Sequence, residues 1–271
     1  MKSRSLPFVL LSLLLMWSCS MEDTQKEADE LFTNGDFKAA AVKYDKVIAI
    51  EPDNSFAVYN RALARQQIGD YQGASDDFTY LIKRKKNIRL AYLGRARCSF
   101  ELQFYKSVVM DMNQLVLRNE NDFDALLLRG LANVKLFKNN DGLNDLDIVL
   151  DHEPDNLEAL ISRGAALTRG GQGVWGLKDF ERAKKINPNL PVIHFNIGVV
   201  YFTLEKWDAA MENFEKALDL NPDYAEAVTR IGMTKLNSPK YSKVEACLDF
   251  EKGKKLGDEL ANDYLSEFCS K

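Results

Sequence analysis

The sequence predicts an all-α fold, a solenoid in which helix hairpins stack on one another. The first observation is a period: Pro52, Pro154, Pro188 and Pro222 are separated by 102, 34 and 34 residues, and 102 is three times 34. The second is that apolar residues recur at helical spacing in two runs per period, with a turn between them. The third is a column of small residues at the same interval, which holds Ala28, Ala62, Ala96, Gly130, Gly164, Gly198 and Gly232. One such hairpin cannot bury its own apolar faces, so the hairpins must stack.

Three further columns explain how each hairpin packs. A second small column lets the two helix backbones approach closely, and it holds Ala40, Ala74, Val108, Gly142, Gly176 and Ala210. A bulky column fills the space toward the next hairpin, and it holds Tyr44, Phe78, Met112, Leu146, Phe180 and Phe214. An aromatic column holds Phe37, Tyr71, Tyr105, Trp207 and Tyr241 and is interrupted by Asn139 and Gly173. We expect Trp175 to turn into the space that Gly173 leaves.

The period divides the chain into seven units, which we expect at residues 21–54, 55–88, 89–122, 123–156, 157–190, 191–224 and 225–258. In the seventh unit, the segment "LNSPKYSK" moves Phe250 two residues beyond the bulky column. This displacement predicts a longer turn between the helices of that unit. Residues 259–271 would form a capping helix whose charged side chains face water.

A 34-residue helix-turn-helix unit with these small, aromatic and proline columns resembles the tetratricopeptide repeat. The resemblance implies a right-handed solenoid that binds a protein or peptide in a concave groove lined by the first helix of each unit. The fifth and ninth places of each unit would face the groove, which gives the candidate partner-binding residues Tyr59, Leu63, Leu93, Arg97, Leu127, Leu131, Ile161, Phe195 and Val199. Because the middle of this set is apolar, we expect an amphipathic helix or an apolar segment as partner. The alternatives are a groove covered by the chain itself and a repeat phase that is off by one residue.

The motif "GQGVWG", residues 171–176, matches the G-x-G-x-x-G fingerprint of dinucleotide-binding loops. That loop must follow a strand and open a helix, and no strand pattern precedes it here. Gly171 falls at the turn of the fifth unit and Gly176 falls in the second small column. We therefore expect no cofactor.

No other constellation indicates an enzyme or a metal site. The carboxylate pairs Asp76–Asp77 and Asp145–Asp147 fall on second helices, where we expect solvated faces. The two histidines, His152 and His194, are expected to be structural, and no Cys, His and Asp spacing suggests a metal ligand set. The sequence therefore predicts no catalytic residues and no metal.

The first residues form a targeting signal, with two basic residues before an apolar run. The stretch "LMWSC" resembles the lipobox of bacterial lipoproteins, which implies a signal peptide over residues 1–18 and a lipid on Cys19. Ser20 after the cysteine implies an outer-membrane lipoprotein that faces the periplasm, and "CSMED" is similar to Bacteroidota lipoproteins. Simple secretion and a membrane span are the alternatives.

The other cysteines and the charges complete the expectations. Cys98 should be a buried thiol, whereas Cys247 and Cys269 are either free or joined in a disulfide that holds the cap. The formal net charge of −4 does not favour binding to nucleic acid, which basic surfaces usually recognise. The basic run "KRKKN", Lys83 to Asn87, should be a solvated helix end, with an acidic partner or lipid head groups as the alternative.

Together these features predict a membrane-anchored, non-enzymatic scaffold that binds a protein partner. The alternative within the binding class is an accessory subunit of an outer-membrane assembly, secretion or transport complex. An enzyme with its active site in the groove and a cytoplasmic adaptor are the remaining rivals.

Overall fold

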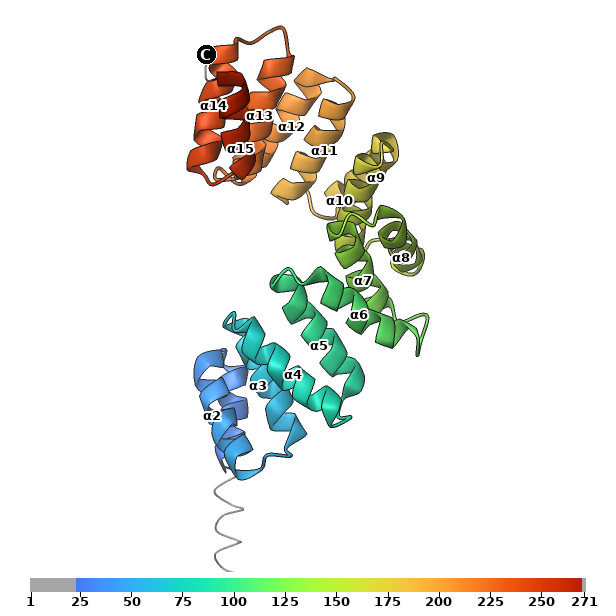
Figure 1. The fold of residues 1–271 in the computed structure, drawn as a ribbon, viewed down its shortest axis with the longest axis vertical. Coiled ribbons are helices and arrows are strands. Elements are labelled where there is room, and N and C mark those ends of the chain that lie inside the picture. Colours follow the sequence, from blue (N-terminus) through green and yellow to red (C-terminus); the bar gives the residue numbers. More distant parts are fainter. Residues whose placement is uncertain (1–22, 270–271) are drawn as a thin grey trace, which may run out of the picture. The chain divides into compact units, whose positions relative to one another are not determined.

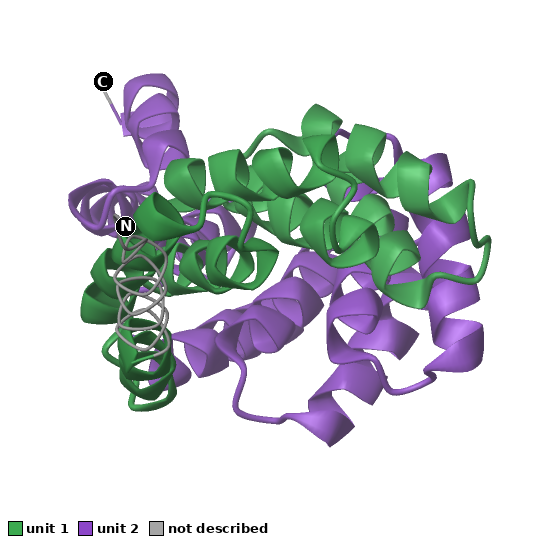
Figure 2. Ribbon diagram, turned by 90° about the horizontal axis from the view of Figure 1, so that it is seen from below, with its two compact units in different colours: residues 1–132 green, residues 133–271 purple. Residues whose placement is uncertain are grey.

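The computed structural model describes residues 23–269, and the expected signal peptide and Cys19 lie outside this range. The described chain is helical and contains no strand (Figure 1). It divides into two compact units, residues 1–132 and 133–271, which are coloured separately in Figure 2. The boundary between the units falls within the helix α7 (Phe123–Lys135).

Helices follow one another through short turns in both units. Unit 1 begins with a helix over residues 23–33. Its further helices are α2 (Phe37–Ile50), α3 (Ser55–Gln67), α4 (Tyr71–Lys83), α5 (Ile88–Glu101), α6 (Tyr105–Val116) and the first part of α7 (Phe123–Lys135). Unit 2 continues with α8 (Asn139–His152), α9 (Leu157–Arg169), α10 (Gly173–Ile186), α11 (Pro191–Thr203), α12 (Trp207–Leu220), α13 (Ala225–Asn237), α14 (Lys243–Lys255), α15 (Glu259–Tyr264) and the π-helical turn η1 (Leu265–Cys269). Each repeat unit that the sequence predicts after residue 54 corresponds to two of these helices.

The helices begin where local chemistry favours a helix start. Asp36, Asn54 and Asp70 each accept a hydrogen bond from the backbone N–H three residues later, which satisfies a free donor at the start of α2, α3 and α4. Pro191 is the first residue of α11, where its missing N–H costs nothing. These caps keep the turns between helices short.

The small and bulky columns form the cores of both units. The alanines of the two small columns and all six residues of the bulky column are buried. Gly164 shows why the column must be small: a Cβ there would lie 2.8 Å from the Phe180 ring and 3.1 Å from the carbonyl oxygen of Gly176. The backbones of α9 and α10 therefore meet at these two glycines, which confirms the packing predicted for Gly176.

The seventh hairpin has the longer turn that the sequence predicts. α13 ends at Asn237 and α14 begins at Lys243, whereas α11 ends at Thr203 and α12 begins at Trp207. Phe250 is fully buried, and its ring would lie 2.7 Å from a Cβ on Gly232. Phe250 thus takes the place of the bulky column despite its shifted position.

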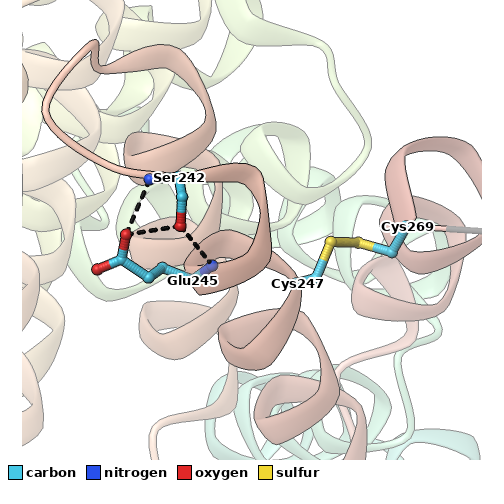
Figure 3. Close-up of a disulfide and its surroundings, with 4 residues drawn as sticks. All are labelled: Ser242, Glu245, Cys247 and Cys269. Atoms are coloured by element: carbon cyan, nitrogen blue, oxygen red, sulfur yellow. Dashed lines mark hydrogen bonds between the residues drawn. A yellow bond between two sulfur atoms is a disulfide. The ribbon is translucent and has the colours of Figure 1, made fainter. Parts of the chain in front are cut away.

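The C-terminal cap is covalently attached to the last hairpin. Cys247 of α14 and Cys269 of η1 are joined by a disulfide, with their Cα atoms 5.9 Å apart (Figure 3). The Tyr264 ring packs 5.4 Å from the Phe250 ring, and Ala261 is buried. The Glu259 side chain is exposed, as expected for a charged residue of the cap.

The expectation for Trp175 is wrong. Its side chain is 59% exposed, and Lys178 Nζ lies 3.9 Å from the centre of its ring. The space beside Gly173 is filled by side chains of the next hairpin, because a Cβ on Gly173 would meet Val200 at 3.4 Å and Thr203 at 3.7 Å. Side chains of α11 thus occupy this space, and the Trp175 side chain lies outside it.

Within residues 23–269, no helix is both long and apolar enough to cross a membrane.

Candidate partner-binding surface

In unit 1 the predicted groove residues lie at different depths. Tyr59, Leu63 and Leu127 are half-buried. Leu93 is only 4% exposed and Leu131 only 5%, because both pack into the core instead of facing solvent. These two leucines support the surface from beneath and offer little area to a partner. Arg97 of α5 is exposed.

In unit 2 the predicted residues Ile161, Phe195 and Val199 are half-buried on α9 and α11. The Phe195 ring lies 5.8 Å from the Phe214 ring and 5.0 Å from the Tyr224 ring. Burial also raises the pKa of Tyr224, to about 12. We use the name first-helix face for the half-buried residues that the first helices present in each unit, which are Tyr59, Leu63 and Leu127 in unit 1 and Ile161, Phe195 and Val199 in unit 2.

The most exposed large apolar side chains are carried by other elements. Second helices and the turns before them carry Phe104, Met110, Phe137, Val174, Trp175, Val244 and Leu248, and Leu117 directly follows α6. This apolar exposure on the second helices is not predicted by the repeat pattern.

An arginine ladder, which was not predicted from the sequence, joins successive second helices. Arg163 of α9 is representative: its Nε and Nη2 donate to Asp179 of α10 at 2.8 and 2.7 Å. Its Nη1 donates at 2.8 Å to Asp147 of α8, the second helix of the preceding hairpin. Arg163 therefore ties its own second helix to the one before.

The ladder recurs at the 34-residue period. The forward pairs are Arg61–Asp77, Arg95–Asp111 and Arg163–Asp179, and the backward bonds run from Arg61 to Asp45, Arg95 to Thr79, Arg129 to Asn113 and Arg163 to Asp147. The bonds to Asp179, together with those to Asp147, raise the pKa of Arg163 and keep its guanidinium charged. The signal was present in the sequence as two columns of opposite charge, Arg61, Arg95, Arg129 and Arg163 with Asp77, Asp111, Asp145 and Asp179.

The expectation of solvated carboxylates is therefore wrong for two of the four. Asp77 and Asp145 are only 4% and 5% exposed. Asp77 accepts hydrogen bonds from Arg61 and also from Arg65, which gives a buried carboxylate the partners it needs. Asp76 and Asp147 are exposed, as expected.

The histidines and the free thiol occupy structural positions. His152 ends α8, and His194 is buried with Nε2 2.8 Å from the carbonyl oxygen of Pro188. Cys98 is fully buried, and burial raises the pKa of its thiol to about 11. A thiol with this pKa is protonated at neutral pH and unreactive. No group of three His, Cys, Asp or Glu residues between 23 and 269 could hold a metal ion.

The basic run at the end of α4 is solvent-exposed. The side chains from Lys83 to Asn87 all face water, and Lys85 and Asn87 adopt left-handed backbone conformations that reverse the chain before α5. Arg84 pairs with Asp53 and lies over the Tyr80 ring at 5.0 Å. The run forms a solvated helix end, as expected.

Comparisons with known proteins agree with this architecture. The tetratricopeptide repeat profile matches residues 191–224, the span of the sixth expected unit. No curated protein sequence matches the chain significantly.

Solved structures of similar fold come from several proteins. A tetratricopeptide repeat protein from Parabacteroides merdae has a TM-score of 0.74 and 23% identity, over 91% of this chain and 98% of that one. The C-terminal part of a repeat protein from Cytophaga hutchinsonii has a TM-score of 0.60 and 14% identity, over 89% of this chain and 99% of that one. YrrB, described as a tetratricopeptide protein with an unusual peptide-binding site, has a TM-score of 0.54 and 20% identity, over 69% of this chain and 96% of that one. The chain therefore has the all-α repeat fold of tetratricopeptide solenoids.

Proposed function

We propose that this protein is a non-enzymatic scaffold, anchored by a lipid on Cys19, that binds a protein partner through its first-helix face. The observation that carries the proposal is the apolar character of that face in each unit, with Leu127 half-buried in unit 1 and Ile161 half-buried in unit 2. Solenoids of this fold serve as interaction scaffolds, and YrrB is described as a peptide binder.

The chemistry of the first-helix face favours an apolar partner. Covering half-buried leucine, isoleucine and phenylalanine side chains with a partner favours binding by about 25 cal/mol per Å² of apolar area that is buried. The set contains no carboxylate, histidine or thiol that could act in catalysis. An amphipathic helix or an apolar extended segment is the ligand that suits such a surface.

The proposed anchor would hold the solenoid close to the bilayer. Cys19 precedes the helix over residues 23–33 by only a few residues, which leaves no long tether. Multiple acyl chains make such an anchor stable. In this proposal the protein recruits its partner at the periplasmic face of the outer membrane.

Affinity purification of the tagged full chain from detergent-solubilised membranes tests the binding surface. Leu127→Glu places a charge on the first-helix face of unit 1, and Leu117→Glu places the same charge on a residue that is 82% exposed after α6. We expect a partner that copurifies with the parent and with Leu117→Glu, and that is lost with Leu127→Glu. Equal recovery with both variants would refute the first-helix face, and stable recovery of a β-barrel protein would indicate an accessory subunit.

Metabolic labelling with a fatty acid tests the anchor separately. The parent should incorporate the label and Cys19→Ala should not. A Cys19→Ala protein that labels as strongly as the parent would exclude acylation at this cysteine.

A further inference from the structure

A notch lies on the second-helix side of unit 2, between α8 and α10. Its volume is about 610 Å³, and its lining includes Asp147 of α8, Arg163 and Leu167 of α9, and Trp175 and Asp179 of α10. We call this cavity the α8/α10 notch. Its size lies within the range typical of ligand sites, about 300–1,000 Å³.

The same notch recurs two repeats earlier, between α4 and α6, with a volume of about 340 Å³. Eight of its nine lining residues lie 68 positions, or two periods of 34, before a lining residue of the α8/α10 notch. Arg95 corresponds to Arg163, Asp111 to Asp179, and Ser99 to Leu167. The notch is therefore a feature of the repeat, and its open space depends on the residue at the place of Leu167.

Between α2 and α4, this place is filled by a basic side chain of the protein itself. Arg65 lies three periods before Leu167, and its Nη1 donates to Asp77 Oδ2 at 2.8 Å and to the Gly73 carbonyl at 3.3 Å. Its Nη2 lies 3.7 Å from Asp45 Oδ1. One carboxylate, Asp77, thus receives two guanidinium groups, from Arg61 and Arg65.

The last hairpin repeats the arrangement with a lysine. Lys235 of α13 occupies the same place, and its Nζ lies 2.8 Å from Asp249 of α14. Where the residue at the place of Leu167 is long and basic, its side chain reaches the carboxylate of the second helix. Where it is Ser99 or Leu167, the place is open.

The α8/α10 notch keeps two of the three carboxylates that surround Arg65, because Gln172 stands where Asp70 Oδ2 lies 3.6 Å from the Arg65 Nε. Asp147 stands at the place of Asp45 and Asp179 at the place of Asp77, while the Asp147 side chain remains 57% exposed. Trp175 stands at the place of Gly73 and adds an exposed aromatic ring, which attracts a guanidinium through its π-face. Lys178 already lies over this ring at 3.9 Å, so the ring accepts a cation.

A second basic residue at the rim, Arg182, is engaged elsewhere. It donates to the Pro154 carbonyl and lies 4.0 Å from Asp155, both in the turn before α9. Arg163 is neutralised by its two carboxylates. The remaining cation of the lining, Lys178, lies over the Trp175 ring, and an arriving guanidinium can displace it from there.

We propose that the α8/α10 notch binds an arginine side chain presented by a protein partner, in the place that Arg65 occupies between α2 and α4. This contact is separate from the first-helix face and does not depend on it. The partner would meet the scaffold on its second-helix side, beside Val174 and Trp175.

The test uses the full chain and three pentapeptides, each with two glycines on either side of a central arginine, glutamine or glutamate. Binding is followed by NMR through the indole N–H signal of Trp175, which Trp175→Phe identifies. We expect the arginine peptide to bind at least about tenfold more tightly than the glutamine peptide, because one charge-assisted hydrogen bond has this effect. Equal binding of the two, or preference for the glutamate peptide, would overturn the proposal.

Two substitutions at one position provide the matched control. Leu167→Arg should fill the notch as Arg65 does, so the arginine peptide should no longer change the Trp175 indole N–H signal. Leu167→Ser should leave the notch open, as Ser99 does, and should retain binding. Binding by Leu167→Arg at the parent's level would contradict the proposal. If Leu167→Arg fails to fold by circular dichroism, Asp147→Asn removes the exposed carboxylate, and unchanged binding by that variant would equally contradict it.

Discussion

Arg163 and Asp179 form a two-point ion pair across the α9–α10 hairpin, although sixteen residues separate them. Because Asp179 is only 4% exposed, removing the arginine leaves a buried charge without its partner. We expect Arg163→Met to lower the free energy of unfolding by about 3 kcal/mol. Urea denaturation followed by circular dichroism measures this change.

The double variant Arg163→Met with Asp179→Leu is the control for that prediction. Replacing both charges removes the unpaired carboxylate, so it should recover most of the loss. A double variant as unstable as the single one would show that the arginine acts through packing alone.

The two tryptophans of the described chain should lose different amounts of stability when they are truncated to alanine. Trp207 is half-buried at the start of α12, with its ring 5.2 Å from the Phe202 ring, and Trp207→Ala should cost about 3 kcal/mol. Trp175→Ala should cost less than about 1 kcal/mol, because the side chain is largely exposed. Thermal denaturation of both variants checks the difference, and equal losses would mean that these environments are misassigned.

The disulfide between Cys247 and Cys269 should hold the cap on the last hairpin. It closes a sequence separation of 22 residues, for which loop-closure entropy gives about 3 kcal/mol. We expect the variant with both cysteines changed to serine to exchange amide hydrogens faster in residues 259–269. Reducing agent should have the same effect on the parent and none on the variant.

The pair Arg89–Asp122 predicts a pH dependence in unit 1. Arg89 donates to both Asp122 oxygens at 2.8 Å, and this interaction lowers the pKa of Asp122. Since the folded pKa lies below the unfolded value of about 3.9, the stabilisation is complete above that pH and is lost as the pH falls through the folded pKa.

The stability difference between the parent and Asp122→Asn should therefore narrow as the pH falls below about 4. Asp124→Asn is the control, because Asp124 pairs with the same arginine but is 56% exposed. Urea midpoints over a pH series would show the effect, and a difference independent of pH would refute it.

The fold could be predicted from the sequence because the residues that repeat every 34 positions are the ones that form the core. The contact between Gly164 and Gly176 and the burial of Phe180 follow from small and bulky columns, since close helix packing needs those sizes at those places. Even the displaced Phe250 was placed correctly, because a longer turn compensates for two extra residues.

The candidate surface was less predictable because position along a helix does not determine depth. Leu93 and Leu131 share a face with Tyr59 and Leu127 in the repeat pattern, yet neighbouring side chains cover them. Asp77 and Asp145 were expected in water, because single charged residues on a helix are usually solvated. Only the sixteen-residue offset between arginine and aspartate columns could have revealed their burial.

The ladder stops where Ile197, buried in α11, replaces the next arginine of the column. Asn213 stands opposite it and donates to Ala209 within its own helix, so the α11–α12 hairpin is joined by apolar packing. Ile231 of α13 likewise stands in the arginine column. The cost of desolvating charges falls as temperature rises, whereas the apolar contribution per unit area levels off. Warming therefore stabilises the hairpins that contain an arginine pair relative to the hairpins that lack one, and a protein made of one repeated unit acquires parts with unequal thermal responses.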